Sequence, residues 1–186
     1  MTNNWHYKVG CVLLVFLLSS CTTENIEEQK FRAEANRELG EEYMRHGKFR
    51  NALKELLKAE ALYPDDYLLQ DNLGLTYHYL GKQDLAISHF KKALELKEDF
   101  MPARNNLGNA YAAQKEWNKA IEQYKKMLQI QPDLPEVHYN LGIAYMKKEE
   151  YGDAIREYQK AIELYPFYAK AYANLGYVYL QQGYAD

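Results

Sequence analysis

The sequence predicts an all-α solenoid, a superhelical array of helix-turn-helix repeats, and two observations support that prediction. A leucine–glycine pair recurs at a constant spacing, with the glycines at Gly40, Gly74, Gly108, Gly142 and Gly176. A tyrosine follows each glycine by three residues, from Tyr43 to Tyr179. The leucine and the tyrosine are four residues apart and share a helical face, and the glycine between them lets a second helix approach closely.

A second helix is expected after each of the first four glycines. An alanine keeps the same period at Ala52, Ala86, Ala120 and Ala154, and a large side chain follows it at Leu56, Phe90, Tyr124 and Tyr158. Pro64, Pro132 and Pro166 would end these helices, because proline cannot continue the helical hydrogen bonds. The second repeat has Glu98 in that place, but Pro102 follows in the first turn of the next helix, where proline is tolerated.

This register divides the chain into repeats at 33–66, 67–100, 101–134 and 135–168, with a partial fifth repeat at 169–186. Asn25, followed by Glu28, resembles a capping box, so the first helix is expected to begin before Ala33, after a short tether within residues 21–32. The fifth repeat lacks its second helix. We expect either that the array continues past Asp186 or that a partner or a second copy covers this edge.

Composition places the chain among globular proteins, with 186 residues, 47% hydrophobic and 26% charged. The formal net charge is −3, and it becomes −4 when residues 1–20, whose only charged side chain is Lys8, are set aside. That weak negative charge argues against nucleic-acid binding. Cys11 and Cys21 both lie near the N-terminus, so no disulfide framework can hold the repeats together.

The repeat pattern, L-G-x-x-Y, then alanine, a large side chain and proline, resembles the tetratricopeptide repeat (TPR) family, whose period is about 34 residues. The resemblance extends from Ala33 to the C-terminus. It implies a superhelix whose concave surface holds other proteins.

The N-terminal segment predicts a bacterial lipoprotein signal peptide over residues 1–20. The run from Val9 to Leu18 is about half the ~20 apolar residues that a membrane-spanning helix needs. Leu18-Ser19-Ser20-Cys21 resembles the lipobox, which implies that Cys21 becomes the lipidated first residue of the mature chain. Thr22 follows the cysteine and favours the outer membrane, with the protein on its periplasmic face. The alternative is an ordinary cleaved signal.

The repeats contain no recognisable catalytic, cofactor or metal site, so we do not expect an enzyme. No phosphate-binding loop, nucleophile elbow or zinc-protease motif occurs. The repeat histidines fall at unrelated places of the period, which makes a shared metal site improbable: His46, His78, His89 and His138.

One stripe of the first helices suggests peptide binding. Four leucine–glycine pairs are preceded by asparagine, at Asn72, Asn106, Asn140 and Asn174, and the first repeat has Glu38 there. The row resembles the asparagine ladder of the O-linked N-acetylglucosamine transferase repeats, which implies that the amides hold the backbone of an extended peptide. Helical spacing adds to this stripe Leu75, Tyr79, Asn109, Ile143 and Tyr177. The alternative is that asparagine is simply common at this place in such helices.

The combined features predict a lipid-anchored, non-enzymatic adaptor that mediates protein–protein contacts in a bacterial cell envelope. They also resemble the TPR lipoproteins that act as pilotins in type IV pilus and secretin assembly. The alternative function is the substrate-recruiting arm of a longer enzyme, such as a glycosyltransferase.

Overall fold

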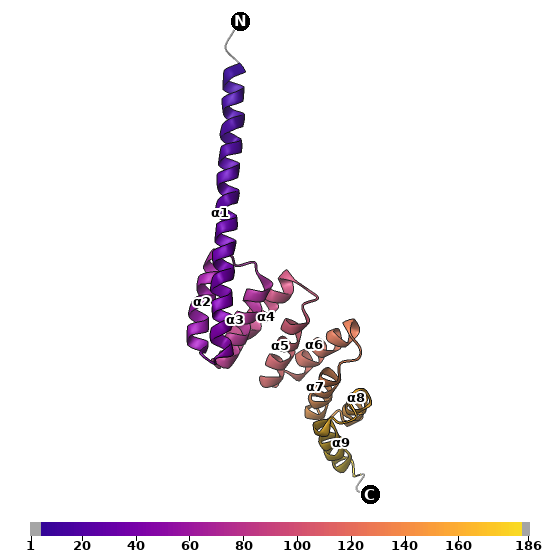
Figure 1. Ribbon diagram of the computed structural model, residues 1–186. Coiled ribbons are helices and arrows are strands. Elements are labelled where there is room, and N and C mark those ends of the chain that lie inside the picture. The colour runs from indigo at the N-terminus through magenta and orange to yellow at the C-terminus, as the bar shows by residue number, and fades with distance from the viewer. Residues whose placement is uncertain (1–4, 184–186) are drawn as a thin grey trace.

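Residues 5–183 fold into nine α-helices joined by short turns in the computed structural model, which describes side chains for residues 25–183. This part of the chain contains no strand, which confirms the predicted all-α solenoid. Successive helices follow one another from the N-terminal to the C-terminal end (Figure 1). The helices are α1 (Trp5–Arg45), α2 (Phe49–Leu62), α3 (Tyr67–Tyr79), α4 (Gln83–Leu96), α5 (Met101–Ala113), α6 (Trp117–Ile130), α7 (Pro135–Lys147), α8 (Tyr151–Leu164) and α9 (Ala169–Gln181).

Helix α1 is longer than expected. It begins at Trp5 and continues without a break to Arg45, so it starts before Ala33, as expected, and includes Asn25 as an internal helical residue. A capping box is a local pattern, and the apolar residues before Asn25 also favour a helix. The side chain of Cys21 lies outside the described residues. In the portion that the structure describes, no helix is long and apolar enough to span a membrane.

The helix pairs repeat with a constant register. Each of α3, α5, α7 and α9 has 13 residues, and each of α2, α4, α6 and α8 has 14. Helices that pack against each other are neighbours in the chain or next but one, as in the direct contacts of α3 with α5 and of α7 with α9. The first helices therefore form a continuous row, with the second helices packed against it.

The repeated leucine–glycine pair marks a site of close helix packing, which we call a glycine notch. We use this name for the space above each first-helix glycine, which a large side chain of the following helix fills. A Cβ atom added to the glycine would lie 2.5–2.7 Å from that side chain in the four pairs Gly40–Leu56, Gly74–Phe90, Gly108–Tyr124 and Gly142–Tyr158. Glycine is therefore required at each notch for the helices to pack this closely.

Proline or aspartate occupies the start of three of the first helices. Pro102 and Pro135 occupy the first turns of α5 and α7. The carboxylate of Asp66 accepts hydrogen bonds from the first backbone N–H groups of α3. The turns inside the repeats use a left-handed residue, for which glycine is best suited. Gly47 and Gly81 supply it in the first two repeats, whereas Lys115 and Glu149 take this conformation in the next two.

In three repeats, a polar side chain of the first helix joins the turn before it to the second helix. We call this set of contacts a junction clip. In each clip, a side chain near the start of a first helix contacts both the backbone carbonyl six residues earlier and a side chain of the next helix. Gln70 donates to the carbonyl of Pro64 at 2.9 Å and accepts from His89 at 2.7 Å. Arg104 contacts the carbonyl of Glu98 and the side chain of Gln123, and His138 contacts the carbonyl of Pro132 and the side chain of Glu157.

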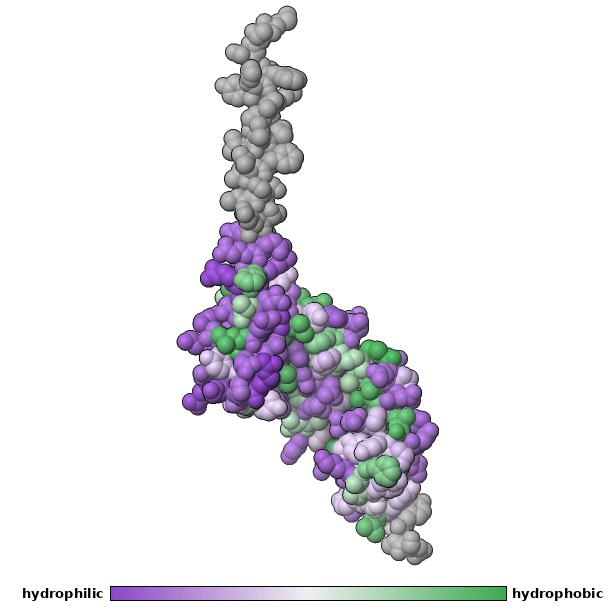
Figure 2. Space-filling view, in the orientation of Figure 1, coloured by the Kyte–Doolittle hydropathy of each residue, from purple (hydrophilic) through white to green (hydrophobic). Residues whose placement is uncertain are grey.

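The surface changes character along the array. Hydrophilic residues dominate around α1 and α2, apolar patches lie over the middle of the array, and residues of intermediate hydropathy prevail near its C-terminal end (Figure 2). The exposed apolar residues at that end are Tyr165, Phe167, Tyr172, Tyr177 and Leu180. The last helix of the array therefore has an apolar surface that no other described residue covers.

Candidate peptide-binding stripe

The proposed stripe lies on the row of first helices, α3, α5, α7 and α9. Its four asparagines are half-buried, as are Leu75 and Ile143. Tyr79, Asn109 and Tyr177 are exposed. The stripe therefore offers partly accessible amides between apolar and aromatic side chains, which suits an extended polypeptide better than a small anion.

Three of the asparagines hold neighbouring repeats together, a role that the sequence did not predict. Asn72 donates to the carboxylate of Glu41 at 2.7 Å, and Asn106 donates to that of Asp71 at 3.0 Å. Asn174 donates to the hydroxyl of Tyr139 at 3.3 Å. Each amide thus bonds to the preceding first helix and not to the next asparagine in the row.

The row of four asparagines, which we call the ladder, retains hydrogen-bonding groups that no described residue uses. An asparagine amide has two N–H groups and a carbonyl oxygen, so the single hydrogen bond donated by Asn72 or Asn106 leaves one N–H and the oxygen for a peptide group. Asn174 has less free capacity, because it also bonds to the hydroxyl of Tyr158. The side chain of Asn140 has no hydrogen-bond partner in the described part of the chain, which makes it the freest of the four. A structural role and a binding role are therefore compatible in this row.

Two other stripe residues also have structural contacts. The hydroxyl of Tyr124 donates to the amide oxygen of Asn109 at 2.7 Å, beside the Gly108 notch. The ring of Tyr79 stacks on Phe49, with 4.4 Å between the ring centroids. Asn109 is consequently a weaker ligand than its exposure suggests, whereas Tyr79 remains largely exposed beside Phe49.

Asp71 is the main electrostatic feature next to the ladder. Its carboxyl group is buried beside Asn106. Burial raises the pKa of Asp71 to about 6, and the hydrogen bond from Asn106 offsets only part of this effect. The charged form of Asp71 is therefore costly at neutral pH.

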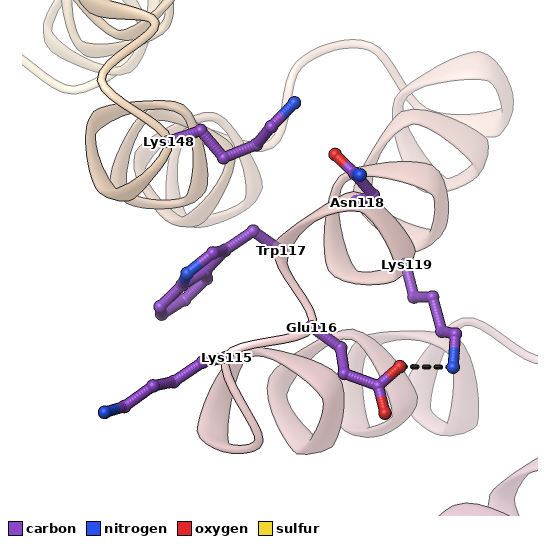
Figure 3. Close-up of a pocket in the computed structure, with 6 residues that line it drawn as sticks. All are labelled: Lys115, Glu116, Trp117, Asn118, Lys119 and Lys148. Atoms are coloured by element: carbon purple, nitrogen blue, oxygen red, sulfur yellow. Dashed lines mark ion pairs between the residues drawn. The ribbon is translucent and has the colours of Figure 1, made fainter.

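A cavity that the sequence did not predict lies between the turn that joins α5 to α6 and the end of α7. It has a volume of about 300 Å³ and surrounds Trp117 at the start of α6, with Lys115 and Lys148 beside the indole ring (Figure 3). Lys119 also lines the cavity but forms an ion pair with Glu116. The signal in the sequence was the turn itself, where Lys115 replaces the glycine of the earlier repeats.

The histidines of the repeats serve structural contacts. His89 and His138 belong to junction clips, His46 contacts Glu42, and His78 contacts Gln83. Among the described side chains, no group of three histidine, cysteine, aspartate or glutamate residues could hold a metal ion.

The sequence pattern of a family described as TPR repeat matches residues 74–115, 108–149 and 144–183, which together cover more than half of the chain. No curated protein matches the chain in sequence.

Several solved structures share the fold. MamA from Desulfovibrio magneticus RS-1, residues 41 to the end, has a TM-score of 0.78 and 24% identity, and the match covers 82% of this chain and 86% of that one. Another MamA crystal structure has a TM-score of 0.74 and 27% identity, covering 77% and 84% of the two chains. Pseudomonas aeruginosa pilF has a TM-score of 0.73 and 20% identity, covering 83% and 71%.

Proposed function

Because this chain belongs to the TPR repeat family, whose members are scaffolds for protein–protein interaction, we propose that it is a non-catalytic adaptor anchored to a bacterial membrane surface. The anchor is lipid on Cys21, and an extended segment of a protein partner binds along the stripe. The observation that carries the binding proposal is the row of half-buried amides with unused donors and acceptors, next to the exposed rings of Tyr79 and Tyr177.

Amides suit this task because each of them can pair with the peptide group of any residue. Contacts to the backbone give affinity with little sequence preference, and the neighbouring aromatic rings add apolar contact area. The partner is therefore expected to bind in an extended conformation.

Photocrosslinking in intact cells tests the stripe. A photoreactive residue at Asn140 or at Tyr177 should crosslink to the same partner, whereas one at Asn51, which is exposed on α2, should not. Asn140 is preferred to Asn106, because removing the Asn106 amide would also leave the buried Asp71 without its hydrogen bond. Equal crosslinking from all three positions would contradict the proposal.

The anchor is tested with the two N-terminal cysteines. Cys21→Ser should abolish lipid labelling and release the protein from the membrane fraction, whereas the matched control Cys11→Ser should leave both unchanged. Lipid labelling that survives in Cys21→Ser would overturn the anchoring proposal. Fractionation of inner and outer membranes then tests the proposed location on the periplasmic face of the outer membrane.

A finer form of the proposal assigns the adaptor to type IV pilus or secretin assembly. It is supported by the resemblance of the lipobox, followed by TPR repeats, to pilotin-like lipoproteins, and the pilF structure shares the fold. Loss of surface pili in a strain without this chain should be restored by the wild-type chain and not by Cys21→Ser. Normal pili in the deleted strain would remove this form and leave the adaptor proposal standing.

A further inference from the structure

Arg104 is a buried arginine whose charge is not neutralised within the array. It lies near the start of α5 and is only 6% exposed. Its guanidinium donates to the backbone carbonyl of Glu98 and, at 3.4 Å, to the side-chain oxygen of Gln123. Both acceptors are neutral, and no carboxylate of a described residue lies within ion-pair distance. Because a buried charge without a counter-charge is unfavourable, this position favours the binding of an anion.

Two other basic side chains show how the array neutralises such groups. Arg37, whose side chain is 11% exposed, forms ion pairs with three carboxylates. His138 occupies the place of Arg104 in the next repeat, and the carboxylate of Glu157 lies 2.7 Å from its ring. Gln123 stands on α6 at the place of Glu157. The third repeat therefore has the stronger base but lacks the matching acid.

The guanidinium of Arg104 retains donors for an anion. A guanidinium has five N–H groups, and the two contacts described above use two of them, which leaves three. One of the remaining groups is the Nε–H, which is buried and has no hydrogen-bond partner in the described part of the chain. Since arginine binds a carboxylate through two parallel N–H groups, these donors allow a bidentate contact.

A cavity that we call the Arg104 cavity borders this side chain. It has a volume of about 420 Å³ and is lined mainly by residues of α4 and α6, including Lys91 and Lys126. Lys126 forms an ion pair with Glu122 at 2.7 Å, whereas Lys91 has no carboxylate partner among the described residues. A cavity of this size can hold a small acid or one acidic side chain.

The acidic residues of the lining restrict the charge of the ligand. Glu95 and Glu98 are exposed and line the Arg104 cavity together with the basic side chains. Their carboxylates repel every negative charge that enters. A ligand with a single negative charge therefore fits this cavity better than the more highly charged phosphate group.

From these observations we propose that the Arg104 cavity binds a carboxylate group, which pairs with the guanidinium of Arg104 and the ammonium group of Lys91. The carboxylate belongs either to a small organic acid or to an acidic side chain of a partner protein. The lining of the cavity includes no residue of the peptide-binding stripe, so the test of this site does not depend on the proposed function.

Acetate is the first probe, added at constant ionic strength to the full chain in detergent micelles. Nitrogen-15 spectra resolve the Nε–H signals of the arginines, and the variant Arg104→Gln identifies the signal of Arg104. This variant is expected to fold, because Gln70 makes the same carbonyl contact in the second repeat. Acetate should shift the Arg104 signal in a saturable manner and leave that of Arg37 unchanged, because Arg37 already has carboxylate partners.

A second variant supplies the acid from within the chain. Gln123→Glu places a carboxylate on α6 where Glu157 faces His138 in the next repeat. Acetate should bind this variant about tenfold more weakly, or less, because the new carboxylate occupies the donors of Arg104. The matched control Gln29→Glu adds the same charge at an exposed place on α1 and should bind acetate like the wild type.

A capped tripeptide with a central glutamate distinguishes the two sources of the carboxylate. Tighter binding of this peptide than of acetate, lost when glutamine replaces the glutamate, assigns the cavity to an acidic side chain, and the opposite order assigns it to a small acid. The proposal is overturned if acetate does not move the Arg104 signal or moves that of Arg37 equally. It is also overturned if Gln123→Glu binds acetate like the wild type, or if inorganic phosphate binds more tightly than acetate.

Discussion

Asp71 shows how a single buried carboxyl group couples the array to pH. Its pKa is raised to about 6 by burial, so the folded state binds a proton more tightly than the unfolded chain does. The stability that this proton contributes is complete below pH 3.8, the ordinary pKa value, and is lost as the pH rises through about 6. The group therefore destabilises the fold at neutral pH, where it is ionised.

Asp71→Asn should stabilise the protein at neutral pH by about 1–3 kcal/mol, because a neutral amide avoids the cost of a buried charge and can still accept the hydrogen bond from Asn106. The gain should shrink toward zero at about pH 4, where Asp71 is already protonated. Urea unfolding of the wild type and the variant at both pH values measures this difference. A gain that is independent of pH would show that the carboxyl group is not the cause.

His138 is also expected to make the protein less stable as the pH rises, but through two hydrogen bonds and not through burial. One ring nitrogen lies 2.7 Å from the carboxylate of Glu157, and the other lies 2.8 Å from the carbonyl of Pro132. Both of these groups can only accept hydrogen bonds. Burial alone would lower the pKa of His138, but the two acceptors favour the doubly protonated ring and raise it. Its stabilising contribution is lost as the pH rises through that raised value.

His138→Arg should remove this loss of stability, because arginine keeps donors for both acceptors at every pH and already occupies the same place as Arg104. The measured quantity is the slope of unfolding free energy against pH between about 6 and 8, which should be flatter in the variant than in the wild type. An unchanged slope would mean that His138 does not titrate in this range. His46→Arg, at an exposed position, is the matched control.

At the scale of the helices, glycine is required only where another helix covers it. An added Cβ at Gly108 would lie 2.7 Å from the ring of Tyr124. Gly108→Ala should therefore destabilise the array by about 1–3 kcal/mol. Gly176→Ala should instead stabilise it by about 0.5–1 kcal/mol, because alanine favours a helix and the space is open. Thermal unfolding of both variants compares them directly. Destabilisation by Gly176→Ala would show that the notch is covered in solution.

Most of the helical architecture could be predicted from the sequence, because its signals are periodic and local. The spacing of Gly74 and Phe90 recurs in every complete repeat, and Pro102 marks a helix start in any context. The start of α1 could not be predicted in this way, because Asn25 has the chemistry of a cap within a segment that forms a continuous helix.

The candidate site was less predictable. The period placed Asn72, Asn106 and Asn174 on one stripe. Their partners come from the first helix of the preceding repeat and differ in chemistry: a glutamate, an aspartate and a tyrosine. The junction clips also lack a common residue type, since Gln70 meets a histidine and His138 meets a glutamate. Contacts of this kind depend on which side chains face each other across helices, and a single sequence does not carry that information.

At the scale of the whole molecule, the array is a row in which each helix depends on its neighbours. Helix α9 packs against preceding helices on one side, and no residue that the structure describes covers its face around Gly176. Its backbone amides should therefore exchange with solvent about tenfold faster, or more, than those of α5 and α7, which have packed neighbours on both sides. Hydrogen-exchange mass spectrometry resolves these helices as separate peptides. Equal protection of α9 and α7 would show that the end of the array is covered.

The junction clips have a consequence for how the chain reaches its fold. The glycine notches resemble one another, so apolar packing alone does not distinguish the second helix of one repeat from that of another. A shift by one repeat would place the guanidinium of Arg104 against the ring of His89 and would give His138 a glutamine in place of its carboxylate. The clips thus favour the native helix pairs, because their polar side chains match only within each repeat. The few polar positions at which the repeats differ therefore help to set the order of otherwise similar units.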